Sequence, residues 1–291
     1  MSITNKMVRE VGEKLYGESL MSIPKDVKER LIEMRDVETS ELARFQLDKI
    51  LENANIAEQK HAVVCQDTGI SSYKIDIGTN VRIEADIEKA LGEGTAEATK
   101  KIPTIPHSVH PITRQNSGNG VGPHTPILHW GMIPGANYIE ITGIPTGGGG
   151  DLCSKIKMLT GSTPFSEVKK FIVDVVVEAG CKPCPPMIVG IGLGGMYESV
   201  NELAKTAVIR PLNKRNKDPI VEEAENELLE MINSLGIGPM GLGGRTTCLA
   251  VNIEYGNTGT YILPVSVKIG CWDVHRKTAR LYDDGHIDYL D

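Results

Sequence analysis

Apolar residues recur at helical spacing through the first sixty residues of the chain. Val8, Val11 and Leu15 lie three or four positions apart, as on one face of a helix. Further helical segments follow, and one of them is predicted to begin near Pro24, because proline is favoured in the first turn of a helix. The pattern therefore predicts a helical N-terminal part of about residues 1–60.

Beyond residue 60, short apolar runs alternate with helical patterns. Strands are predicted at 61–64, 127–132, 138–142, 187–193, 247–255, 261–269 and 279–281, and helices at 84–101, 168–178, 199–209 and 219–235. Residues 102–126 are rich in Pro, Gly, Asn and His, and they are predicted to form a long functional or mobile loop. The irregular alternation indicates an α/β or α+β fold: a single large domain, residues 1–291, with N-terminal helices before a mixed sheet in an α/β part of about 61–291.

Composition excludes several classes of function. The formal net charge of −7 does not suit a nucleic-acid-binding surface, which requires a basic face. No apolar run reaches the roughly 18 to 20 residues that span a bilayer, and no targeting segment is recognisable at the start of the chain. We therefore expect a cytoplasmic protein without nucleic-acid or membrane partners.

Three of the six cysteines stand where a predicted strand gives way to a loop or turn. Cys65, Cys184 and Cys271 are each flanked by Pro or Gly, or by a turn sequence, which can fix the direction of a thiolate. A [4Fe–4S] cluster held by three cysteines leaves one iron open, and an open iron can act as a Lewis acid. Buried apolar cysteines remain an alternative, and Cys181 with Cys184 has the spacing of a half zinc site or a redox pair.

Three sequence blocks resemble one family. They are Val64-Cys65-Gln66-Asp67-Thr68-Gly69, Lys182-Pro183-Cys184-Pro185-Pro186 with the Ile188–Gly192 run, and Gly270-Cys271-Trp272 with His275-Arg276. Along nearly its whole length the chain is similar to the N-terminal domain of class I fumarases and to the α-subunits of two-subunit fumarases and L(+)-tartrate dehydratases. The third block is most like the tartrate dehydratase form.

The resemblance implies a function and a set of site residues. Cys65, Cys184 and Cys271 would hold a [4Fe–4S] cluster with one open iron site, on loops at strand ends. Asp67 would move the proton, since dehydration of a 2-hydroxy acid removes a weakly acidic proton beside a carboxylate. The remaining substrate-binding residues would be Gln66, Asn116, Gly148, Gly149 and His275. Glycine permits close approach and offers bare N–H groups to a carboxylate.

Two positions depart from the family pattern. Ile105 stands where relatives carry a substrate-binding arginine, and Thr146 stands where a lysine often precedes the glycine run. Losing a guanidinium removes a bidentate carboxylate clamp, for which Arg114, His107 or His110 could compensate. The substrate is therefore expected to be a small hydroxy di-acid of the fumarate/malate or tartrate/oxaloacetate type, or a different hydroxy acid.

The family resemblance also implies partners. Single-chain relatives carry a second domain, so we expect a separate β-subunit that completes the active site, in an α2β2 or larger assembly. Two other readings stay open: a non-catalytic iron–sulfur sensor, and a zinc-stabilised binding module on Cys181 and Cys184. Gln66 and Asp67 beside a ligand favour catalysis, because a sensor needs no proton shuttle.

Overall fold

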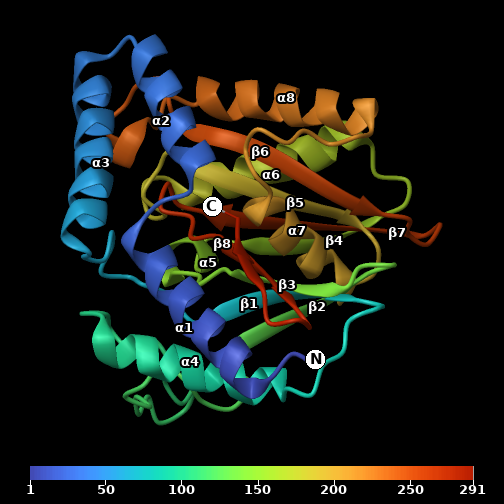
Figure 1. Ribbon diagram of the computed structural model, residues 1–291. Helices are drawn as coiled ribbons and strands as arrows, with labels where there is room; N and C mark the ends of the chain where they lie inside the picture. The colour runs from blue at the N-terminus through green and yellow to red at the C-terminus, as the bar shows by residue number, and fades with distance from the viewer. Residues whose placement is uncertain (291) are drawn as a thin grey trace. The chain divides into compact units, whose positions relative to one another are not determined.

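The computed structural model describes residues 1–290, and the chain folds into two compact units (Figure 1). The first unit comprises residues 1–24, 53–147 and 275–290, and the second comprises residues 25–52 and 148–274. Helix α3 (Glu41–Lys60) begins in the second unit and ends in the first. Each unit contains its own sheet and its own hydrophobic core.

The first unit is a five-stranded mixed sheet with the order β2-β1-β3-β8-β9. Its elements are α1 (Asn5–Met21), β1 (Ser72–Gly78), α4 (Ile87–Lys101), β2 (Ile127–Ile133), β3 (Tyr138–Gly143), β8 (Lys277–Tyr282) and β9 (Ile287–Tyr289). β1 and β2 are parallel, and the other pairs are antiparallel. α1 and α4 pack closely together, since a methyl group on Gly94 would lie 2.4 Å from the Arg9 carbonyl oxygen.

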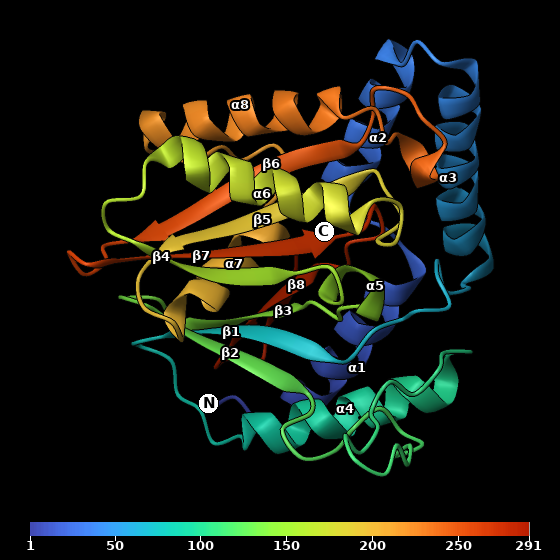
Figure 2. The ribbon, with the colours of Figure 1, turned by 180° about the vertical axis from the view of Figure 1, so that it is seen from behind.

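The second unit contains a four-stranded sheet with the order β4-β7-β5-β6. Its elements are α2 (Lys25–Val37), α5 (Gly148–Asp151), β4 (Lys155–Thr160), α6 (Phe165–Ala179), β5 (Met187–Gly194), α7 (Ser199–Ile209), α8 (Pro219–Ser234), the 3-10 turn η1 (Pro239–Gly241), β6 (Cys248–Gly256) and β7 (Ile262–Gly270). α6 and α8 lie along the same side of this sheet (Figure 2).

Large apolar residues alternate with glycines along β5, and this alternation explains how helices cover both faces of the second sheet. Met187, Val189 and Ile191 belong to the core shared with α6 and α8. The intervening Gly190 and Gly192 face α7, and a methyl group on Gly192 would lie 2.0 Å from the Val200 carbonyl oxygen. Helix α7 can therefore lie directly on the strand only because these two positions are glycine.

The predicted α/β class is confirmed, and so are the three N-terminal helices. The predicted mixed sheet is present as two mixed sheets, one in each unit. The division into parts of about 1–60 and 61–291 stays a prediction as a domain assignment.

The predicted strand at 61–64 is wrong. This segment is irregular, because its backbone bonds to helices: Ala62 N–H donates to Ala57 O at 3.0 Å and Val64 N–H donates to Leu20 O at 2.9 Å. The prediction that all three candidate cysteines follow strand ends is therefore also corrected. Cys271 directly follows β7, Cys184 precedes β5, and Cys65 lies in the loop after α3.

Candidate active site

The segment with Cys65 and Asp67 is fixed by backbone contacts within the first unit. Ile70 N–H donates to Thr146 O at 3.0 Å, and Thr146 N–H donates back to Ile70 O at 3.1 Å. Gly69 has a φ of +81°, and a methyl group there would lie 2.4 Å from the Thr146 carbonyl carbon. Only glycine satisfies both the left-handed backbone and this close approach, so the turn is held firmly against residues 144–147.

This arrangement brings the carboxylate of Asp67 beside the start of the glycine run. A methyl group on Gly147 would lie 2.9 Å from Asp67 Oδ2. The Asp67 side chain is 43% exposed, Gln66 is exposed and Cys65 is half-buried. A carboxylate that is anchored by its backbone yet accessible can reach a bound molecule, as a proton-transfer group requires.

The loop of residues 102–126 approaches the same carboxylate. Thr104 Oγ1 donates to Thr68 Oγ1 at 2.6 Å, and Thr68 Oγ1 lies 3.3 Å from the Ile105 carbonyl oxygen that accepts from it. His107 Nδ1 lies 4.0 Å from Asp67 Oδ1. The predicted long loop therefore lies beside Asp67, and His107, one of the residues considered as a replacement for the arginine missing at position 105, is a neighbour of this carboxylate.

Two further predicted residues of the first unit have internal contacts. Asn116 Nδ2 donates to Pro106 O at 2.7 Å, and Asn116 Oδ1 accepts from Gly118 N–H at 2.7 Å. His275 is 5% exposed, and its Nδ1 lies 2.6 Å from the Ser19 carbonyl oxygen at the end of α1. These contacts give Asn116 a role in shaping the loop and His275 a role in the core, so their contact with substrate stays a prediction.

Within the second unit, Cys184 and Cys271 lie at the same end of the sheet. β5 and β7 are antiparallel with Ile188 opposite Gly270, so the start of β5 and the end of β7 are adjacent. Cys184 is held in a turn after α6, where its N–H donates to Cys181 O at 3.1 Å and its φ is +52°. The sequence thus brings two of the three predicted ligands to one sheet end.

The glycine-rich helix α5 packs at this same end of the second sheet (Figure 2). A methyl group on Gly150 would lie 2.1 Å from the Ile269 carbonyl oxygen, and one on Gly149 would lie 3.6 Å from the Lys182 carbonyl oxygen. Ser154 Oγ donates to Gly150 O at 2.9 Å and accepts from Ile269 N–H at 3.0 Å. Gly148 and Gly149 are therefore close in space to the segments that carry Cys184 and Cys271.

Lys268 is a charged residue near this end that sequence reasoning missed. It lies on β7 three positions before Cys271 and forms an ion pair with Asp151 of α5. Burial lowers the pKa of Lys268 to about 8. Only the packing of α5 on β7 could have indicated this pair, since the two residues are far apart in the sequence.

Exposure separates the cysteines into two groups. Cys65, Cys184 and Cys271 are half-buried and Cys181 is exposed, whereas Cys153 and Cys248 are buried. Burial raises the pKa of the Cys248 thiol to about 12, so this cysteine is a poor thiolate. The three predicted ligands therefore have the access that a ligand requires. Neither unit, within residues 1–290, gathers three or more His, Cys, Asp or Glu side chains into a group that could hold a metal ion on its own.

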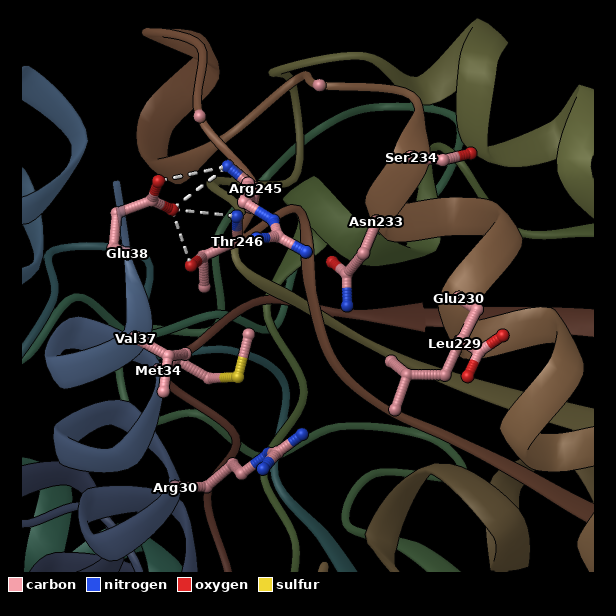
Figure 3. Close-up of a pocket in the computed structure, with 12 residues that line it drawn as sticks. Arg30, Met34, Val37, Glu38, Leu229, Glu230, Asn233, Ser234, Arg245 and Thr246 are labelled. Atoms are coloured by element: carbon pink, nitrogen blue, oxygen red, sulfur yellow. Dashed lines mark hydrogen bonds between the residues drawn. The ribbon is translucent and has the colours of Figure 1, made fainter. Parts of the chain in front are cut away.

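A pocket of about 600 Å³ in the second unit contains none of the predicted site residues (Figure 3). It is lined by Arg30, Met34, Val37, Glu38, Leu229, Glu230, Asn233, Ser234, Gly236, Gly244, Arg245 and Thr246. Glu38 is 1% exposed and accepts hydrogen bonds from the backbone N–H groups of Thr39, Ser40, Arg245 and Thr246 and from Thr246 Oγ1.

Those bonds leave the Glu38 carboxylate fully used by the protein. Burial by itself would raise its pKa, but the hydrogen bonds from Ser40, Thr246, Thr39 and Arg245 outweigh burial and lower it. We therefore assign Glu38 a structural role, as a connection between the end of α2 and the loop before β6. Among the helices of residues 1–290, none has the length and apolar character needed to cross a membrane.

Comparison with known proteins gives a consistent result. A family model described as Fumarate hydratase (Fumerase) matches residues 9–280. The chain is 38% identical over 283 residues to a provisionally named L(+)-tartrate dehydratase subunit alpha of Methanocaldococcus jannaschii, covering 96% of this chain and 99% of the relative. It is 30% identical over 262 residues to the L(+)-tartrate dehydratase subunit alpha of Escherichia coli strain K12 and to that of Shigella boydii serotype 4, covering 90% of this chain and 86% of each relative.

Proposed function

Since this chain belongs to the fumarate hydratase (Fumerase) family, it is a hydro-lyase, and we propose that it adds or removes water at a small hydroxy di-acid as the iron–sulfur α-subunit of a two-subunit enzyme. The observation that carries the proposal is the pairing of this family match with the thiols. The three cysteines in the family blocks are half-buried, while Cys153 and Cys248 are buried. This pattern supports a ligand role over a core role.

We propose that Cys65, Cys184 and Cys271 hold a [4Fe–4S] cluster. Thiolate is the donor that such clusters require, and three of them leave one iron without a protein ligand. When bound, the cluster supplies a Lewis acid for a hydroxyl and a carboxylate oxygen. Cys181, although exposed, is proposed to be a neighbour of the site and not a fourth ligand.

The polypeptide itself would move the proton and orient the substrate. Asp67 is the proposed acid–base residue, because its accessible carboxylate is held beside Gly147 by a backbone turn. Gln66, Gly148 and Gly149 would bind substrate, the glycines through bare N–H groups facing a carboxylate. Asn116 and His275 remain proposed contributors, each with the structural contacts described above.

The tartrate type of di-acid is the preferred substrate, with fumarate and malate as the alternatives. The relatives compared above are named as L(+)-tartrate dehydratase subunits. Ile105 is 46% exposed where the family resemblance led us to expect an arginine, and an exposed isoleucine cannot clamp a carboxylate. This same observation favours the second candidate, a hydro-lyase acting on a different hydroxy acid.

The relatives' names as alpha subunits support a separate β-subunit that completes the active site. An α2β2 or larger assembly and a cytoplasmic location remain part of the proposal. The assembly can be checked by co-expressing the two subunits and measuring the mass of the purified complex.

The decisive experiment is anaerobic reconstitution with iron and sulfide, followed by EPR and iron analysis. The chain should take up about four irons, and Cys65→Ser, Cys184→Ser and Cys271→Ser should each lose most of them. Cys153→Ser serves as the matched control and should load normally. Uptake that is indifferent to the three family cysteines would refute the cluster proposal and return Cys181 and Cys184 to consideration as a zinc or redox pair.

Turnover then separates enzyme from sensor. The reconstituted complex with its β-subunit should dehydrate L(+)-tartrate, or hydrate or dehydrate another di-acid. A stable cluster without turnover of L(+)-tartrate, malate or fumarate would favour a different hydroxy acid, or a cluster protein that senses oxygen.

A further inference from the structure

We infer that His107 is a positioning residue for Asp67: its Nδ1–H orients the carboxylate that moves the proton. The inference rests on the proposed function, because it assigns Asp67 an acid–base role. It concerns a position two residues after the departure at Ile105, in a loop that the sequence alone left without defined contacts.

The segment that carries His107 is fixed on both sides. On one side, Thr104 Oγ1 donates to Thr68 Oγ1 at 2.6 Å, and Thr68 is the residue after Asp67. On the other side, the Ser108 carbonyl oxygen accepts from the Ser117 N–H at 2.8 Å. Since both anchors are short hydrogen bonds, His107 is presented to Asp67 by the loop and does not reach it by chance.

The two ring nitrogens of His107 have different surroundings. Nδ1 lies 4.0 Å from Asp67 Oδ1, while Nε2 is buried and has no hydrogen-bond partner among residues 1–290. The His107 side chain as a whole is 26% exposed. A buried polar atom without a partner is unusual in a folded protein and requires an explanation.

The unpartnered Nε2 bears on which tautomer of the ring is favoured. A proton on Nε2 would be a buried donor with nothing to accept it, which is unfavourable. A proton on Nδ1 instead faces a carboxylate oxygen, so the Nδ1–H tautomer is favoured. At 4.0 Å the contact is longer than a hydrogen bond, and a small movement of the accessible carboxylate would close it.

The orientation of the Asp67 carboxylate matters because one of its two oxygens must face the substrate to exchange a proton with it. Asp67 Oδ2 faces Gly147, where the glycine run begins, and Oδ1 faces His107. A donor that holds Oδ1 fixes the direction of Oδ2 toward the start of the glycine run. His107 therefore acts on catalysis through Asp67 and makes no direct contact with the reacting atoms.

Three substitutions at residue 107 test this role in the reconstituted complex with its β-subunit. His107→Asn retains an N–H donor near the Nδ1 position, His107→Gln moves the donor toward the Nε2 position, and His107→Leu removes it. His107→Leu and His107→Gln should lower kcat by roughly 10- to 100-fold, as misplacement of a catalytic group does, with little change in KM. His107→Asn should recover most of the loss.

The inference would be overturned if all three variants had the same kcat, whether equal to that of the wild type or lower. A change confined to KM would overturn it too, because a direct substrate contact would produce it. Thermal unfolding of each variant should resemble that of the wild type, which distinguishes positioning from a general loss of structure.

A second readout needs neither cluster nor substrate. Long-range ¹H–¹⁵N NMR of the histidine-labelled full chain reports the tautomer of each ring. His275, whose Nδ1 must donate to Ser19 O, is the internal standard for Nδ1–H. His110, whose Nδ1 accepts from the backbone N–H groups of Ile112 and Thr113 at 3.2 Å, is the standard for Nε2–H.

The ring ¹⁵N shifts of His107 should show the Nδ1–H tautomer, as those of His275 do. The Nδ1 resonance of His107 should shift in the Asp67→Asn variant. An Nε2–H signature like that of His110, or no response to Asp67→Asn, would refute the positioning role. If the complex proves inactive but the NMR result is as expected, the proposed function fails while the His107–Asp67 pair stands.

Discussion

Replacing Glu38 by glutamine should destabilise the second unit strongly. The carboxylate accepts five hydrogen bonds, four from backbone N–H groups and one from a hydroxyl, at 2.8 to 3.1 Å. Glutamine has nearly the same shape but presents an NH2 group in place of one oxygen. Whichever way the amide turns, its NH2 faces at least two backbone donors and leaves them buried without an acceptor.

The magnitude follows from those lost acceptors. A hydrogen bond to a charged group contributes roughly 1.5–3 kcal/mol, and a buried donor without a partner costs roughly 1–3 kcal/mol. The terms are not additive, because the donors share one carboxylate and can relax together. We expect Glu38→Gln to reduce the free energy of unfolding by about 2–4 kcal/mol.

The effect should also depend on pH. The pKa of Glu38 in the folded protein lies below its ordinary value of 4.5. The stabilisation is therefore fully present above 4.5 and is lost as pH falls through the folded pKa. The difference between wild type and Glu38→Gln should be largest near about pH 7 and should narrow in acid.

Urea unfolding of the metal-free chain, followed by circular dichroism, measures both effects without a contribution from cluster loss. Glu33→Gln, on α2 just before Glu38, is the matched control. Its side chain is 64% exposed and pairs with Arg30 at 3.0 Å, so the change should be within about 1 kcal/mol. A Glu38→Gln variant as stable as this control, or a difference that does not change with pH, would refute the reasoning.

Three other outcomes are expected. Gly192→Ala should displace α7 and lower the urea midpoint severely, because the new methyl group would lie 2.0 Å from the Val200 carbonyl oxygen. Gly259→Ala is the control and should be tolerated, because its nearest neighbour lies at 3.5 Å. Burial lowers the pKa of Lys268 from 10.5 to about 8, so the free energy of unfolding should rise with pH between those values. Lys268→Met should flatten this rise, measured as the urea midpoint at each pH. An unchanged slope in the variant would contradict the prediction. Iodoacetamide should label Cys181 in the native chain and spare Cys153 and Cys248 by mass spectrometry, and early labelling of Cys248 would contradict its burial.

The helices and the buried strands could be predicted from the sequence because their patterns are local. Helix α7 begins and ends at the predicted residues 199 and 209, and β5 was found from its continuous apolar run. The strands β1, β4 and β9 were missed. Most of β4 is exposed, β9 has only three residues, and β1 carries Lys74 and Asp76 among its buried positions. Such strands are defined by the partners with which they pair, which a single sequence does not reveal.

The false strand at 61–64 shows the opposite error. Its apolar residues satisfy a strand pattern, but their backbone groups bond to the ends of α1 and α3. For the site, the cysteines and Asp67 were identified through family blocks, whereas His107 was considered only as a replacement for the missing arginine and Lys268 was not singled out. Their significance depends on contacts with Asp67 and Asp151 that are made only after folding.

The interleaving of the two units has a consequence for how the protein forms during synthesis. The second unit needs only residues 25–52 and 148–274, so all of its strands have been translated before β8 exists. The first unit has β1, β2 and β3 early, but β3 must wait for β8, which is encoded after residue 274, to cover its open edge. An unpaired strand edge invites wrong pairing. Nascent chains should therefore depend on chaperone protection during the interval between translation of β3 and translation of β8, and ribosome-bound fragments ending before residue 277 should be the species most prone to aggregate.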